Sequence, residues 1–111
     1  MFEKDLNISY LLDFYGELLT DRKRTIMDMY FNEDYSLSEI AEQIGISRQG
    51  VRDIIKKSED DLHFYEEKLG LAKKLQTVES AVTALYNNAI SQNVPTETQR
   101  KIAELAELVK Q

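Results

Sequence analysis

Residues 36–57 read SLSEIAEQIGISRQGVRDIIKK, two apolar periodic runs separated by a glycine. Ser36 precedes the first run and Glu39 follows three residues later, which is the spacing of a capping box at a helix start. Gly45 stands where a left-handed residue can end a helix without steric cost. Ser47 can then cap a second helix. The stretch therefore predicts a helix-turn-helix, two helices joined by a tight turn.

The predicted second helix has two different faces. Val51 and Ile55 recur at helical spacing and are expected in the core. The remaining face, at 100° per residue, is polar and carries Arg48, Gln49, Arg52, Asp53, Lys56 and, at its edge, Lys57. Arg48 and Arg52 are one turn apart, which suits two guanidinium groups directed at guanine edges or phosphates, and Gln49 can pair with adenine.

Five side chains of this face form a candidate nucleic-acid-binding site: Arg48, Gln49, Arg52, Lys56 and Lys57. In this interpretation the first three read bases and the two lysines hold phosphates. The alternative is a solvated helix face with ordinary surface charge. Asp53 favours that alternative, because a carboxylate within the face repels phosphate unless it accepts from cytosine or pairs with Lys56 or Lys57.

The charge distribution singles out the same helix. The chain has a net charge of −6, but residues 47–57 hold four bases against one acid. A Debye length of about 8 Å at physiological salt screens much of the distant acidic surface from a ligand docked there. A second basic run, Arg22, Lys23 and Arg24, opens another predicted helix, where positive charge opposes the helix dipole. That run is interpreted either as a phosphate contact or as a solvated surface.

Composition narrows the class of protein. The 111 residues fit one small domain or a small domain with an extension. The chain has no cysteine and one histidine, His63, so no cofactor, metal site or catalytic group is assigned and an enzyme is disfavoured. Residues 1–9 do not resemble a secretory signal and no apolar run is long enough to span a membrane, so a cytoplasmic protein is expected.

The periodicity predicts an all-α chain. We expect a first helix over Asn7–Leu19, with Leu18 in the core, and a second over Arg22–Phe31. Heptad spacing then continues past the helix-turn-helix, through Val51, Ile55, Ser58, Leu62, Tyr65 and Leu69. After Gly70 the same spacing recurs in Leu71, Leu75, Val78, Val82, Leu85 and Ala89.

These two stripes define the expected organisation. Residues 1–58 form the helix-turn-helix domain and residues 59–111 form a helical carboxyl-terminal arm. An amphipathic stripe of this length needs a partner surface. A homodimer is expected, and a compact bundle in which the arm folds back is the alternative.

The order of motifs resembles a known family. The chain is similar to region 4 of the bacterial sigma-70 factors and, more closely, to the YlxM family of small bacterial helix-turn-helix proteins. The residues that carry the resemblance are Phe14-Tyr15, Leu18-Leu19-Thr20-Asp21, Asp34-Tyr35-Ser36-Leu37-Ser38-Glu39-Ile40-Ala41 and Ile46-Ser47-Arg48-Gln49. Gly50 departs from the pattern, since an alanine is usual there.

The resemblance implies a DNA-binding regulatory protein with a sigma-70 region 4-like bundle, associated with the signal recognition particle pathway. Its partners would be DNA or the protein or RNA of that particle. A second hypothesis is an accessory factor of the particle, and a third is a helical interaction module that does not bind DNA. The third is favoured by Asp53 and by the acidic net charge.

Overall fold

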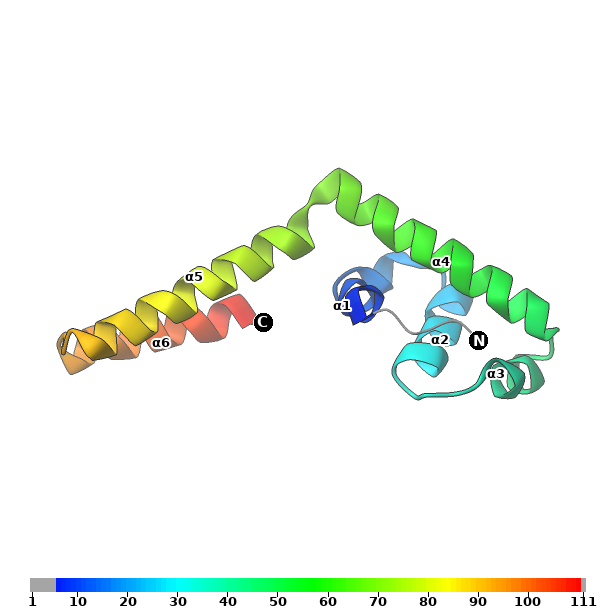
Figure 1. Ribbon diagram of the computed structural model, residues 1–111, viewed down its shortest axis with the longest axis horizontal. Helices are drawn as coiled ribbons and strands as arrows, with labels where there is room; N and C mark the ends of the chain where they lie inside the picture. Colours follow the sequence, from blue (N-terminus) through cyan, green and yellow to red (C-terminus); the bar gives the residue numbers. More distant parts are fainter. Residues whose placement is uncertain (1–5, 111) are drawn as a thin grey trace. The chain divides into compact units, whose positions relative to one another are not determined.

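The computed structural model describes residues 6–110, which form six α-helices, one short 3-10 helix and no strand (Figure 1). The expected all-α class is confirmed. The elements are α1 Leu6–Tyr15, η1 Gly16–Leu18, α2 Asp21–Phe31, α3 Leu37–Ile44, α4 Arg48–Leu69, α5 Leu71–Ser91 and α6 Thr96–Lys110. They divide into two compact units, residues 1–69 and residues 70–111, and Met1–Asp5 and Gln111 lie outside the described residues.

The first unit is built around α4, which packs against α1, α2 and α3 (Figure 1). The first four positions of the predicted heptad stripe are buried: Val51 and Leu62 are 0% exposed, and Ile55 and the polar Ser58 are equally enclosed. The stripe therefore finds its partner within the same unit, because three shorter helices of the chain cover it. Ile26, Met27 and Ile40 complete this core from α2 and α3.

The first helix is shorter than expected. α1 ends at Tyr15, and the chain tightens into η1 before α2 begins. The change from 3.6 to about 3 residues per turn rotates the side chains that follow. Leu18, expected in the core, is 55% exposed, whereas Leu19 is buried at 6%. The prediction that Leu18 lies in the core was therefore wrong. The 3-10 helix that begins at Gly16 rotates the Leu18 side chain out of the core.

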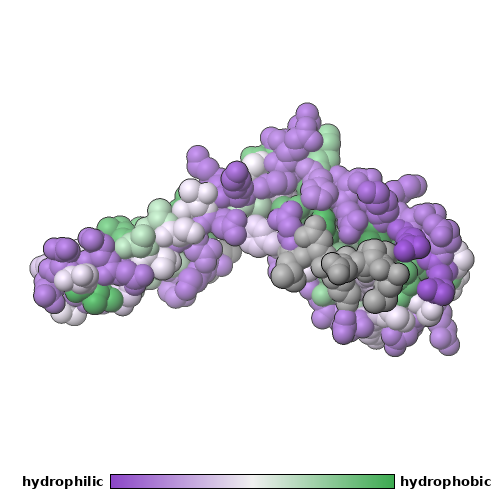
Figure 2. All heavy atoms as spheres, viewed as in Figure 1, coloured by the Kyte–Doolittle hydropathy of each residue, from purple (hydrophilic) through white to green (hydrophobic). Residues whose placement is uncertain are grey.

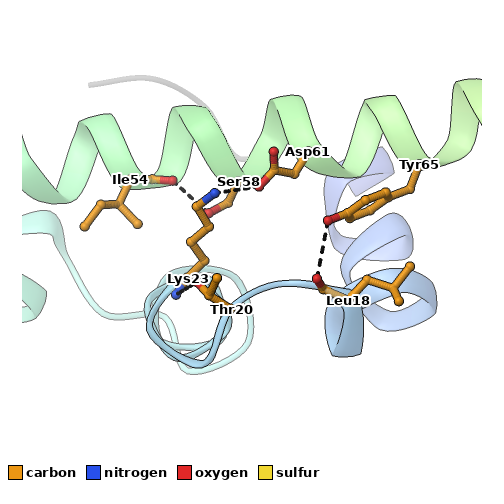
Figure 3. A network of polar contacts seen from close by, with 7 residues as sticks. All are labelled: Leu18, Thr20, Lys23, Ile54, Ser58, Asp61 and Tyr65. Carbon is orange, nitrogen blue, oxygen red and sulfur yellow. Dashed lines mark hydrogen bonds and ion pairs between the residues drawn. The ribbon is translucent and has the colours of Figure 1, made fainter.

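Polar contacts hold α4 to the helices beneath it (Figure 3). Lys23 Nζ lies 2.7 Å from Asp61 Oδ2, and the Tyr65 hydroxyl donates to the Leu18 carbonyl over 3.3 Å. The buried Ser58 hydroxyl donates to the Ile54 carbonyl at 2.8 Å, so the polar position of the stripe is satisfied within α4 itself. The contacts of Lys23 with Asp61 and of Tyr65 with Leu18 join α4 to α2 and η1.

Gly70 separates the two units. It has φ +62°, a left-handed conformation that glycine adopts readily, and α4 ends directly before it. The expected domain boundary after Ser58 falls inside α4, which continues unbroken to Leu69. Residues 59–69 belong to the first unit because Leu62 is enclosed in its core.

The second unit is a hairpin of α5 and α6, which lie side by side and antiparallel (Figure 1). The predicted stripe is divided here: Val82 and Ala89 are buried, but Leu71, Val78 and Leu85 are 38% to 50% exposed. The apolar stripe of α5 is wider than the surface that α6 covers, so part of the stripe stays exposed. Within residues 6–110, no helix has both the length and the apolar character needed to cross a membrane.

Candidate nucleic-acid interface

The helix-turn-helix begins with a complete capping box. The Ser36 backbone N–H donates to Glu39 Oε1 at 2.9 Å, and the Glu39 N–H donates to Ser36 Oγ at 3.1 Å. The N–H of Ser36, followed by its hydroxyl, lowers the pKa of Glu39, because both hydrogen bonds favour the ionised carboxylate. The start of α3 predicted from the sequence is confirmed.

The turn places α4 against α3. Gly45 has φ +84°, and its N–H donates to the Ala41 carbonyl, which ends α3 in a left-handed cap. Ser47 Oγ accepts from the Gly50 N–H at 2.9 Å and caps α4. A Cβ at Gly50 would stand 3.2 Å from Ser47 Oγ, so glycine leaves room for this close cap.

This packing leaves one face of the first turns of α4 in solvent. All five predicted site residues are exposed: Arg48, Gln49, Arg52, Lys56 and Lys57. At 100° per residue, Arg48 and Arg52 lie about 40° apart along one edge, Gln49 and Lys56 occupy the centre, and Lys57 lies at the other edge. The structure therefore brings the five together on one surface, called here the reading face.

The centre of the reading face is occupied by one hydrogen bond and one ion pair that were not predicted from the sequence. Gln49 Nε2 donates to Asp53 Oδ1 at 2.9 Å, and Lys56 Nζ lies 3.6 Å from Asp60 Oδ1. Asp53 therefore pairs with Gln49, and not with either lysine. The four-residue spacing of both pairs was a readable signal for them.

The two ends of the face differ from its centre. Within residues 6–110, neither Arg48 nor Lys57 takes part in an ion pair or a side-chain hydrogen bond. Gln49, Arg52 and Lys56 of the face also line an open hollow of about 410 Å³, and the rest of its described lining is Asp53, Ile55 and Glu59. The face thus combines exposed cationic groups, an amide held by a carboxylate and a shallow depression.

The three residues of the second basic run, Arg22, Lys23 and Arg24, have different surroundings. Lys23 is bound to Asp61, and Arg24 lies 3.9 Å from Glu17 and 3.7 Å from Asp28. Two of its three charges are therefore matched by neighbouring acids. Arg22 is exposed, and a phosphate contact by this run stays a prediction for Arg22.

The comparison with known proteins identifies the family. Residues 2–106 match the family model described as "Putative helix-turn-helix protein, YlxM / p13 like". The chain belongs to this helix-turn-helix family. The match covers the helix-turn-helix and nearly all of the α5–α6 hairpin, so both units are part of the family's common architecture.

Several curated relatives carry the same family name, UPF0122 protein. One from Caldanaerobacter subterraneus subsp. tengcongensis is 61% identical over 71 residues, which is 64% of this chain and 61% of the relative. One from Thermoanaerobacter sp. (strain X514) is 55% identical over 73 residues, or 66% of this chain and 62% of the relative. One from Listeria monocytogenes serovar 1/2a is 45% identical over 93 residues, or 84% of each chain. The matches thus span about three fifths of the first two relatives.

Proposed function

We propose that this protein is a DNA-binding regulator that docks the reading face of α4 in the major groove. The observation that carries the proposal is the arrangement of the helix-turn-helix: α3 and α4 are capped at Ser36 and Ser47, and the packed stripe turns the cationic side of α4 outward. An α-helix fits the major groove, where arginine and glutamine side chains can recognise base edges.

Each residue of the face has a separate role in this proposal. Arg48 and Arg52 contact guanine edges or phosphates from neighbouring turns, and Gln49 pairs with adenine. Gln49 donates one N–H to Asp53, so its Oε1 and second N–H remain for the base. Lys56 and Lys57 contact phosphates and contribute affinity that does not depend on sequence.

The proposal includes a homodimer, in which each copy supplies one reading face. Dimeric helix-turn-helix proteins bind two half-sites about one helical turn apart, and a palindromic site reflects their two-fold symmetry. A cytoplasmic protein without catalytic activity is consistent with this function.

A second candidate function is an accessory factor of the signal recognition particle, which the family resemblance implies. The acidity of the first unit favours it: residues 1–69 hold nine Lys and Arg against sixteen Asp and Glu, a net charge of −7. Such a surface repels nucleic acid outside the reading face and suits a protein partner or a structured RNA contacted at few points.

Equilibrium selection from a random duplex library at about 0.1 M salt tests the first candidate, with particle RNA as a parallel competitor. Recovery of a palindrome supports a dimeric DNA reader. Saturable RNA binding without an enriched duplex contradicts it and supports the accessory factor. Failure to bind either nucleic acid would instead support a protein-interaction module.

A further inference from the structure

The α5–α6 hairpin has very little buried interior. No residue of α6 is buried, and the buried residues of α5 are Ala72, Val82 and Ala89, two of which are alanines. A unit of about 40 residues rarely buries enough apolar surface for independent stability. A single layer of two helices also cannot enclose a core, since each helix is covered along one line.

A second apolar line runs along the outside of the hairpin. On α5 it consists of Val78, Ala81 and Leu85, and on α6 of Leu105 and Leu108. The four larger side chains are 38%, 49%, 44% and 66% exposed in that order. The view in Figure 2 shows apolar surface interspersed with polar surface along this hairpin. We call these five residues the hairpin apolar face.

Helix geometry places the five residues on one side. At 100° per residue, Val78 and Leu85 lie within about 20° of each other around α5. Both are rotated in the same direction from Val82, which lies on the side of α5 that contacts α6. Leu105 and Leu108 are displaced in the same rotational sense from the line of α6 that contacts α5. When two antiparallel helices pack together, side chains rotated in the same sense from the contact line of each helix lie on the same side of the pair. Equivalent heptad positions of antiparallel coiled coils behave in this way.

The charge of the hairpin indicates what covers this face. Residues 70–111 hold five Lys and Arg against four Asp and Glu, a net charge of +1, in contrast to −7 for the rest of the chain. On α6, Arg100 binds Glu97 and Glu104 within one helix, and these two carboxylates raise its pKa. Five apolar side chains on a unit of near-zero net charge offer little to a nucleic acid or a strongly charged protein, whereas a second neutral apolar face complements them.

We infer that the hairpin apolar face binds the same face of a second copy of this chain. Two hairpins packed about a two-fold axis form a four-helix bundle, in which both apolar lines of each helix are covered. The first unit does not offer an equivalent contact, because its charge of −7 makes two copies repel. The inference deepens the proposed function by locating its dimer interface, and it rests on the dimer alone, not on DNA binding.

Sedimentation velocity of the full chain at tens of micromolar, without nucleic acid, tests the inference. The wild type is expected at twice 12.9 kDa. Leu85→Glu places a charge in the interface and is expected to raise the dimer dissociation constant about 100-fold or more. Ile90→Glu is the matched control, because Ile90 is 44% exposed on the same helix but faces away from the apolar line.

Circular dichroism of each variant shows whether the helices are retained. If Leu85→Glu loses helix, Leu85→Ala replaces it, since alanine favours the helix while removing the contact; about tenfold weaker dimerisation is then expected. A monomeric wild type, a dimer unaffected by Leu85 variants, or equal disruption by Ile90→Glu would overturn the inference. A monomer that still selects a duplex would reject this interface and leave the reading face intact.

Discussion

The two units of this protein use the same sequence pattern with different results. In α4 the heptad stripe from Val51 to Leu62 is almost completely enclosed, because α1, α2 and α3 cover it. In α5 the corresponding stripe leaves Val78 and Leu85 half-exposed, because within the second unit α6 is the one helix that packs against it. Periodicity therefore specifies that an apolar face exists, but the number of neighbouring helices determines how much of that face is buried.

The largest expected effect of this difference in burial is on stability, when one large apolar side chain in each unit is replaced by alanine. Leu62 is 0% exposed, so Leu62→Ala should lower the free energy of unfolding by about 2–5 kcal/mol. Ile90 is 44% exposed on the hairpin, and Ile90→Ala should cost under about 1 kcal/mol. Urea denaturation followed by circular dichroism gives both values. Equal losses would show that the two units are packed to the same degree.

The two glycines with left-handed backbone angles, Gly45 and Gly70, allow the interior of the first unit to be compared with the boundary between the units. Gly45 lies inside the first unit at φ +84°, and Gly45→Ala should cost about 1–2 kcal/mol through backbone strain. Gly70→Ala should cost less, because separate cores flank it and alanine there can adopt helical angles. Thermal unfolding of both variants compares them, with Gly45→Asn as a control that tolerates the left-handed conformation. A larger effect at Gly70 would contradict the division into two units.

The capping box gives a smaller effect with a defined pH dependence. Ser36→Ala removes the acceptor for the Glu39 N–H and should cost about 1 kcal/mol. Because the pKa of Glu39 is lowered in the folded state, its carboxylate stabilises the fold above its ordinary pKa of about 4.3. That contribution is lost as the pH falls through the lowered value.

Denaturation at pH 7 and at pH 3 measures this term, with Glu39→Gln as the matched control. The glutamine keeps an acceptor oxygen but cannot titrate, so the pH dependence should be weaker in the variant than in the wild type. An identical dependence in both proteins would remove Glu39 from the acid-sensitive groups.

Local signals in the sequence predicted the helix-turn-helix in detail. Ser36, Glu39, Gly45 and Ser47 act on backbone groups within four residues, so their roles follow from spacing alone. The same holds for the exposure of the five site residues, which follows from the helical repeat.

Tertiary features were harder to predict because they depend on distant residues. The pairing of Lys23 with Asp61 joins positions 38 residues apart, and no local pattern specifies it. The exposure of Leu18 depends on the change to η1 at Gly16, which helical periodicity does not detect. The division of the α5 stripe required knowledge that one helix covers it. By contrast, the bond from Gln49 to Asp53 was local and readable.

The central claim is that the exposed side of α4 binds DNA and the hairpin does not. Fluorescence anisotropy with a selected duplex at about 0.1 M salt tests it, comparing Arg48→Ala/Arg52→Ala with Lys73→Ala/Lys110→Ala, which removes the same charge from the hairpin. Loss of sequence preference and at least tenfold weaker binding in the first variant, with near wild-type binding in the second, is the predicted result. Equal affinities for both variants would contradict the assignment of the reading face.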